Sequence, residues 1–171
     1  MVREVLVYPD KNLKKISKNV EIFDARLHNL LEDMRETMYA HDGIGLAAIQ
    51  IGIDENVLII NLPNEDGEQT LENLVEIINP MVLESQGSVI YQEGCLSVPD
   101  VHEDVERKES IKVRYFDRYG KKIEEELNGL MSIAFQHELD HLNGHLFIEK
   151  LSYLKRKKFE KEWKKKLKER K

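Results

Sequence analysis

Between residues 128 and 144 the apolar positions recur at the spacing of a helix. They fall on one face together with two histidines, and this stripe consists of Leu130, Ile133, Ala134, His137 and His141. Asn128 or Gly129 can open the helix, and Asn143-Gly144 is a typical stop signal. We therefore predict a helix over 130–142 that carries two imidazoles on its apolar face.

Two further helices are predicted from the same kind of pattern. After Asp24, which suits an N-cap, the apolar residues at helical spacing are Leu27, Leu30, Leu31, Met34 and Met38, which predicts a helix near 24–41. Near the C-terminus Phe159, Trp163 and Leu167 are spaced by four, which predicts a helix over about 152–169.

Short runs rich in β-branched and aromatic residues predict the strands. They are 57–61, 75–79 and 81–84 around Pro80, 87–92, 111–117 and 121–127, the last two joined at Arg118-Tyr119-Gly120. Together with the helices they predict an α+β fold. We expect mainly antiparallel β-sheets wrapped around the central helix 130–142, with a C-terminal helix outside them.

Length and composition narrow the class of protein. A chain of 171 residues that is 41% hydrophobic suits one domain over residues 1–171, including the C-terminal helix. The sequence has no apolar run of 18 residues, and its first ten residues lack an apolar signal region, so we expect a cytoplasmic protein without a membrane partner. The single cysteine cannot form an internal disulfide and fits a reducing compartment.

The two histidines of the predicted helix belong to a His-Glu-x-x-His pattern. On an apolar helix face a lone histidine is most often a hydrogen-bonded core residue. Here Glu138 adds a third polar group that is costly to bury, so the pattern favours a metal bound by His137 and His141. Glu138 is then the group that transfers protons, not a ligand.

A metal centre of this kind needs a third protein ligand. The longer zincin motif would place a histidine at position 147, which is Phe147, and His145 is expected in a surface loop. The other common third ligand is a glutamate on a second, downstream helix. The candidates are Glu149, Glu160, Glu162 and Glu169, and three of them lie in a lysine-rich tail with no sign of a buried site. An endopeptidase of the His-Glu-x-x-His class is therefore disfavoured.

The only cysteine, Cys95, is a candidate third ligand. A single cysteine is often a small buried apolar residue, but Gly94 before it and Pro99 after it indicate a shaped turn at the end of a strand. A thiolate with two imidazoles is a chemically sensible ligand set for a divalent metal. A binding module with a closed structural site would need a fourth protein ligand, and no second cysteine is present to supply it.

The segment GIGLAAIQ at 43–50 has two possible interpretations. As a nucleotide-binding loop it lacks the third glycine, because position 48 is Ala48, and a predicted helix precedes it where a strand is required. In the alternative interpretation its glycines let another backbone approach closely. Gln50 is then one polar group among small apolar neighbours, and its amide can donate to a developing oxyanion.

Three segments in this order and at these separations resemble the signature motifs of the peptide deformylase family. They are GIGLAAIQ (43–50), EGCLS (93–97) and QHELDHLNG (136–144), and they span about 100 residues of the chain. The resemblance implies removal of the formyl group from the N-terminal formylmethionine of newly made proteins, with release of formate. It also implies one metal ion bound by Cys95, His137 and His141, usually iron(II), with zinc, nickel or cobalt able to replace it.

The same resemblance assigns roles to other residues. Glu138 would transfer protons, while the Gln50 amide and the Leu96 N–H would hold the oxyanion. The methionine pocket would be lined by Ile44, Tyr91, Leu130, Ile133 and Ala134. The peptide would pair as an added strand with 44–46 and 91–94, which include Gly45, Glu93 and Gly94. Glu93 would form an ion pair with Arg107. Apart from the resemblance, His102 lies seven residues after Cys95 and could approach the cleft.

The C-terminal tail differs from the body in charge. Residues 155–171 contain eleven Lys or Arg against three Glu, a net charge of +8, whereas the whole chain carries −6 and residues 1–154 therefore carry −14. Packing of Phe159, Trp163 and Leu167 on the domain would still leave a basic outer face, for which a polyanion is the natural partner. For an enzyme acting on nascent polypeptides the family resemblance implies ribosomal RNA, and so a ribosome contact through this helix rather than DNA.

Overall fold

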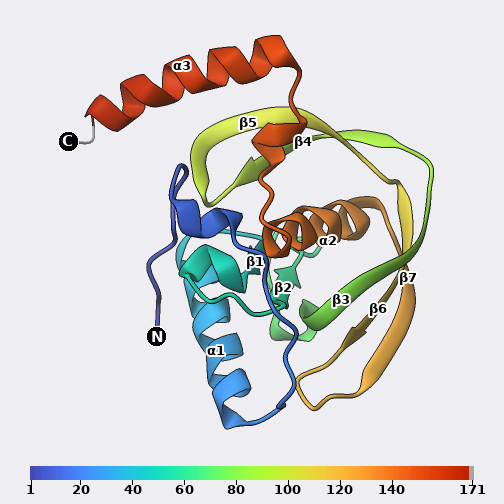
Figure 1. Ribbon diagram of the computed structural model, residues 1–171. Helices are drawn as coiled ribbons and strands as arrows, with labels where there is room; N and C mark the ends of the chain where they lie inside the picture. The colour runs from blue at the N-terminus through green and yellow to red at the C-terminus, as the bar shows by residue number, and fades with distance from the viewer. Residues whose placement is uncertain (170–171) are drawn as a thin grey trace.

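The computed structural model describes residues 1–169 (Figure 1). These residues form three α-helices: α1 (Ala25–Ala40), α2 (Gly129–Leu142) and α3 (Tyr153–Glu169). They form seven strands: β1 (Gly45–Ala47), β2 (Val57–Asn61), β3 (Leu74–Gln86), β4 (Val89–Cys95), β5 (Val98–Arg107), β6 (Ser110–Phe116) and β7 (Lys122–Asn128). Short 3-10 helices are η1 (Lys11–Lys14), η2 (Ala48–Ile51), η3 (Leu71–Asn73) and η4 (Phe147–Lys150). All three predicted helices are confirmed.

The strands form two antiparallel sheets. The larger has the order β1-β2-β3-β6-β7, and the smaller consists of β4 and β5. Helix α2 contacts β1, β2, β6 and β7, and Figure 1 places it among the strands with α1 and α3 outside them. The predicted α+β fold, with antiparallel sheets around the helix that carries the histidines, is confirmed.

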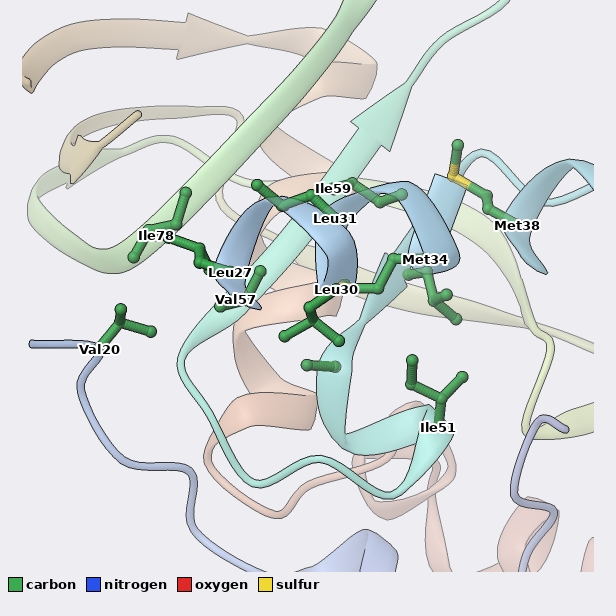
Figure 2. Packing of buried hydrophobic residues seen from close by; sticks show 12 residues of the cluster. Val20, Leu27, Leu30, Leu31, Met34, Met38, Ile51, Val57, Ile59 and Ile78 are labelled. Carbon is green, nitrogen blue, oxygen red and sulfur yellow. The ribbon is translucent and has the colours of Figure 1, made fainter. Parts of the chain in front are cut away.

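Strand β2 is apolar over four consecutive residues because both of its faces are covered. Val57 and Ile59 pack in a cluster with α1, which Figure 2 shows, while Leu58 and Ile60 pack in a second cluster with α2. Successive side chains of a strand point to opposite faces, so a run without polar residues is expected where helices cover both. The larger sheet thus separates α1 from α2 and fixes the position of both.

The sequence suggested that Pro80 separates two strands, but the structure has one continuous strand there. The predicted strands 75–79 and 81–84 are one strand, β3, whose pairing with β6 shifts register between Ile78 and Met81. Asn79 has a left-handed φ of 53° at this point. Pro80 therefore lies where the ladder is already interrupted, and its missing N–H removes no hydrogen bond.

Two strands were not predicted, and one was placed too early. The strand expected at 87–92 runs from Val89 to Cys95, and its partner β5 contains Pro99 as its second residue. Pairing passes from Glu93 opposite Glu103 to Cys95 opposite Val98, so Pro99 lies in an irregular stretch that tolerates it. Strand β1 has three residues, too few to form a recognisable alternation.

Helix α3 packs on the body through its aromatic residues. Phe159 and Trp163 are buried, Leu167 lies against the same cluster, and the indole Nε1 of Trp163 donates to the carbonyl of Tyr8 at 3.0 Å. The predicted packing face is therefore confirmed. Arg170 and Lys171, which belong to the predicted basic tail, lie outside the described residues.

None of the helices in residues 1–169 is both long and apolar enough to cross a bilayer.

Candidate active site

Three side chains from two elements converge at one end of α2. Cys95 ends β4, and its Sγ lies 3.2 Å from Nε2 of His141, which in turn lies 3.3 Å from Nε2 of His137. The three atoms all lie within 4.8 Å of one another. Ligands of a tetrahedral metal at about 2.0 to 2.3 Å lie roughly 3.3 to 3.8 Å apart, so the spacing suits one bound ion.

The surroundings of His137 also favour a cation. Its Nδ1 contacts Oε1 of Glu93 at 2.8 Å, which leaves the Nε2 lone pair directed at the site. Burial alone would lower the pKa of His137, but hydrogen bonds with Cys95 and Glu93 raise it well above its ordinary value. A divalent ion can take the place of that proton. Burial lowers the pKa of His141, which keeps its imidazole neutral and able to coordinate.

Glu93 is held in turn by Arg107. The guanidinium donates from Nε and one Nη to the two oxygens of Glu93, each at 2.8 Å, and from the other Nη to Asp140 at 2.6 Å. Burial raises the pKa of Glu93, but Arg107 and then His137 outweigh it, and the net pKa is lowered. The predicted pair of Glu93 and Arg107 is present. Its extension to Asp140, which ties β4 and β5 to α2, was not predicted.

Glu138 is a buried carboxyl group beside this cluster. Its Oε1 lies 3.7 Å from Nε2 of His137, beyond hydrogen-bond distance, and its Oε2 has no hydrogen-bond partner within residues 1–169. Burial raises the pKa of Glu138 to about 7. A carboxyl group with such a pKa can both take and return a proton near neutral pH, and it lies outside the set of three converging ligand atoms.

Gln50 reaches the same cluster from η2. Its side chain is buried, with Oε1 accepting from the Ala47 amide at 2.9 Å and Nε2 donating to the hydroxyl of Ser97 at 3.1 Å. The same nitrogen lies 3.6 Å from Sγ of Cys95. The amide is thus fixed at its oxygen end and presents its donor beside the thiol.

A cleft of about 570 Å³ opens over these groups. All eight residues predicted to bind substrate line it: Ile44, Gly45, Tyr91, Glu93, Gly94, Leu130, Ile133 and Ala134. Gln50, Leu96 and Glu138 line it as well, while His141 is fully buried beneath. His102, for which the sequence had left this position open, is also a lining residue.

Several lining residues were missed by sequence reasoning. Val5 and Val7 border the cleft, and their alternation in the N-terminal segment is a signal that could have indicated an extended segment there. Asp42 and Asp100 also line it, each with a left-handed φ, of 55° and 64° respectively. No local pattern in the sequence marks these two positions.

Two strand edges border the cleft. Strand β1 is at the end of the larger sheet, and within residues 1–169 β4 pairs only with β5. Residues 43–45 on one side and 91–95 on the other line the cleft, so an extended peptide can add to either edge. A Cβ on Gly45 would lie 3.1 Å from Cγ of Glu138. This glycine therefore lets β1 lie directly against the buried carboxyl group.

The end of α2 supplies a test of stability. Gly144 follows the helix with φ 81°, and a Cβ there would collide with the carbonyl oxygen of Lys14. We expect Gly144→Ala to lower the free energy of unfolding by more than about 1 kcal/mol, measured by urea denaturation. Gly129→Ala is the matched control, because Gly129 also has positive φ, 59°, but open space around it. Equal losses for the two variants would contradict the expected collision.

The chain matches known proteins over nearly its full length. The family model described as polypeptide deformylase matches residues 2–157. The peptide deformylase of Nautilia profundicola is 54% identical over 168 residues, which cover 98% of this chain and 97% of the relative. That of Helicobacter pylori strain G27 is 56% identical over 161 residues, with 94% and 92% covered.

The fold is likewise similar to solved structures. The crystal structure of a peptide deformylase from Legionella pneumophila superposes with a TM-score of 0.89 at 40% identity, covering 100% of this chain and 99% of that one. A family model that matches residues 2–157 and relatives more than half identical over at least 94% of the chain lead to one assignment. The chain belongs to the polypeptide deformylase family.

Proposed function

We propose that the chain is a metal-dependent hydrolase that removes the formyl group from the N-terminal formylmethionine of newly made proteins and releases formate. The observation that carries the proposal is the convergence of Cys95, His137 and His141 beside the buried carboxyl group of Glu138, whose Oε2 has no hydrogen-bond partner among residues 1–169. We further infer that residues 1–171 act as one catalytic domain, in the cytoplasm, where formylated chains are made.

Cys95, His137 and His141 would hold the metal. Thiolate and imidazole suit iron(II), zinc, nickel and cobalt alike, and the family resemblance favours iron(II). When bound, such an ion lowers the pKa of water and polarises a carbonyl group. Glu93 and Arg107 serve this set indirectly, because they fix the ring of His137.

Glu138 is the proton carrier in the proposal. It accepts a proton from the attacking water while a bond forms between the water oxygen and the formyl carbon. It then gives the proton to the leaving nitrogen as the C–N bond breaks, which yields formate and a free methionine amine. Its pKa of about 7 suits both steps near neutral pH.

The Gln50 amide and the Leu96 N–H would stabilise the oxyanion of the formyl group. We expect Gln50→Leu to lower kcat about 10²–10³-fold, the usual effect of removing one such donor. Steady-state kinetics on formyl-Met-Ala-Ser measures this. Because Gln50 also lies near the thiol of Cys95, metal content must be measured in parallel. A kcat within about twofold of wild type at equal metal content would remove Gln50 from this role.

The cleft explains the choice of substrate in the proposal. The methionine side chain would enter the apolar part of the cleft between α2 and the two strand edges, lined by Ile44, Tyr91, Leu130, Ile133 and Ala134. The peptide beyond it would pair with 44–46 and 91–94. Strand pairing is made of hydrogen bonds to the peptide backbone, so one enzyme can accept many sequences after methionine.

Product analysis tests this function against peptide-bond cleavage. Formyl-Met-Ala-Ser is incubated with metal-loaded protein and the products are analysed by mass spectrometry. The proposal expects intact Met-Ala-Ser and an equal amount of formate. Fragments cut between residues, without formate, would instead indicate an endopeptidase.

The basic face of α3 is proposed to contact ribosomal RNA. Phe159 and Trp163 face the body, and the exposed lysines of the helix are Lys155, Lys157, Lys158, Lys161, Lys164, Lys165 and Lys168. Their arrangement gives a cationic outer surface on a body of opposite charge. Such a face would hold the enzyme near emerging chains.

Charge reversal on α3 tests this contact. We expect the triple variant Lys161→Glu, Lys164→Glu, Lys168→Glu to co-sediment with ribosomes at least about tenfold more weakly, while kcat/KM on formyl-Met-Ala-Ser is unchanged. Wild-type binding should also fall steeply with added salt, because phosphate contacts release counterions. The matched control reverses exposed lysines of β6 and β7 and its preceding turn, at Lys112, Lys121 and Lys122. An equal loss in the control, or no loss in either, would contradict a specific role for α3.

A further inference from the structure

The side chain of Gln69 connects the cleft edge to the end of β2. Its Nε2 donates to the carbonyl of Gly43 at 2.9 Å and to the carbonyl of Asn61 at 2.7 Å. A primary amide has two N–H donors, so both are used in this bridge. Gln69 is half-buried and lies outside the three sequence motifs.

Asn61 holds the next residue of the same edge. It is fully buried, and its backbone N–H donates to the carbonyl of Ile44 at 2.8 Å. Its side-chain Nδ2 donates to the hydroxyl of Tyr39 at 2.6 Å and to the carbonyl of Thr70 at 2.9 Å. The carbonyls of Gly43 and Ile44 are thus both bound by residues that do not line the cleft.

The loop before Gln69 is ordered by its own hydrogen bonds. Oδ1 of Asn64 accepts from the amides of Asp66 and Glu68 at 3.0 and 2.9 Å, and the Asn64 amide donates to the carbonyl of Glu68 at 2.8 Å. A loop closed in this way fixes where the next residue points. Gln69 is therefore presented to Gly43 at little further entropic cost.

The segment 43–45 has no slack against the groups below it. A Cβ on Gly43 would lie 2.9 Å from Cδ1 of Leu96, and one on Gly45 would lie 3.1 Å from Cγ of Glu138. Ile44, between them, lines the cleft. A shift of this segment relative to Leu96 and Glu138 would therefore alter how the edge of β1 pairs with an added peptide strand.

We propose that Gln69 is a positioning residue for peptide recognition. Together with Asn61 it holds the backbone of residues 43–45 in the position in which it pairs with the substrate backbone. This inference rests on the proposed deformylase function and deepens it. Gln69 reaches the substrate only through the backbone it supports. Its loss should therefore weaken binding of peptides longer than formylmethionine and leave the proton transfer at Glu138 intact.

The test compares two substrates in one variant. Gln69→Met keeps the length of the side chain and removes both donors. We expect the advantage in kcat/KM of formyl-Met-Ala-Ser over formylmethionine to fall about five- to tenfold, the effect of roughly one hydrogen bond. The fall should come from KM of the tripeptide, with kcat within about twofold of wild type. Gln86→Met, at the exposed end of β3, is the matched control and should leave the ratio unchanged.

A second variant covers the case in which Gln69→Met does not fold. Asn64→Ala loosens the loop without touching Gly43 or Asn61, and it should lower the same ratio to a smaller extent. A wild-type ratio in Asn64→Ala and in any folded Gln69→Met protein would overturn the inference, as would an equal loss in Gln86→Met. Failure of the wild-type protein to release formate from either substrate would instead overturn the proposed function itself.

Discussion

Replacing Glu138 with glutamine should leave a folded, metal-loaded protein whose kcat on formyl-Met-Ala-Ser is about 10³–10⁴-fold below that of wild type. Glutamine has nearly the same size and can occupy the same buried site, but it cannot take a proton from water. The proton is needed twice, once in attack and once for the leaving amine. Steady-state kinetics with metal analysis of the same samples measures both parts of the expectation.

Glu84→Gln is the control for this variant, because Glu84 is exposed on β3 and does not line the cleft. It should keep wild-type kcat and metal content. If Glu138→Gln folded normally but lost the metal, the assignment of Glu138 as a group outside the ligand set would be wrong. If it kept the metal and turned over at the wild-type rate, Glu138 would not be the proton carrier.

The second large effect concerns the ligand set. We expect Cys95→Ala and His137→Ala to lower metal affinity by more than about 100-fold. Replacing a residue that only hydrogen-bonds to a ligand costs up to about 100-fold, so removing the ligand itself should cost more. Activity should fall with metal occupancy. Cys95→Asp keeps an oxygen donor, so it should retain part of the metal with poor activity.

Glu93→Gln provides the graded comparison for the ligand variants. Glu93 contacts His137 but is not among the three converging atoms, so its replacement should cost only about 10–100-fold in affinity. Affinities are measured by competition with a chelator of known strength. Metal binding to Cys95→Ala at the wild-type affinity would contradict the proposed ligand set.

The parts of the fold that could be predicted are those with a strong local period. Helix α2 was predicted nearly to its bounds because its apolar stripe and its Asn-Gly stop are adjacent in sequence. Strand β5 was missed because its burial is mixed and Pro99 resembles a turn signal, although the irregular pairing beside Cys95 accommodates it. Propensity at one proline was thus overridden by tertiary pairing.

The residues of the candidate site also differ in whether the sequence could predict them. Cys95, His137 and His141 could be predicted because ligand chemistry restricts which residues can serve, and Glu138 follows from the helix pattern. Gln69 could not be predicted, because an amide that bonds two backbone carbonyls leaves no pattern in the sequence. The link from Arg107 to Asp140 also depends on how β5 meets α2, which only the assembled fold determines.

Formate release by the wild-type protein under anaerobic conditions tests the central claim most directly. The protein is first stripped of metal with a chelator and then titrated with iron(II) in the presence of formyl-Met-Ala-Ser. We predict no release from the stripped protein and activity that rises until one ion is bound per chain. Absence of formate with iron(II), zinc, nickel and cobalt alike would contradict the account.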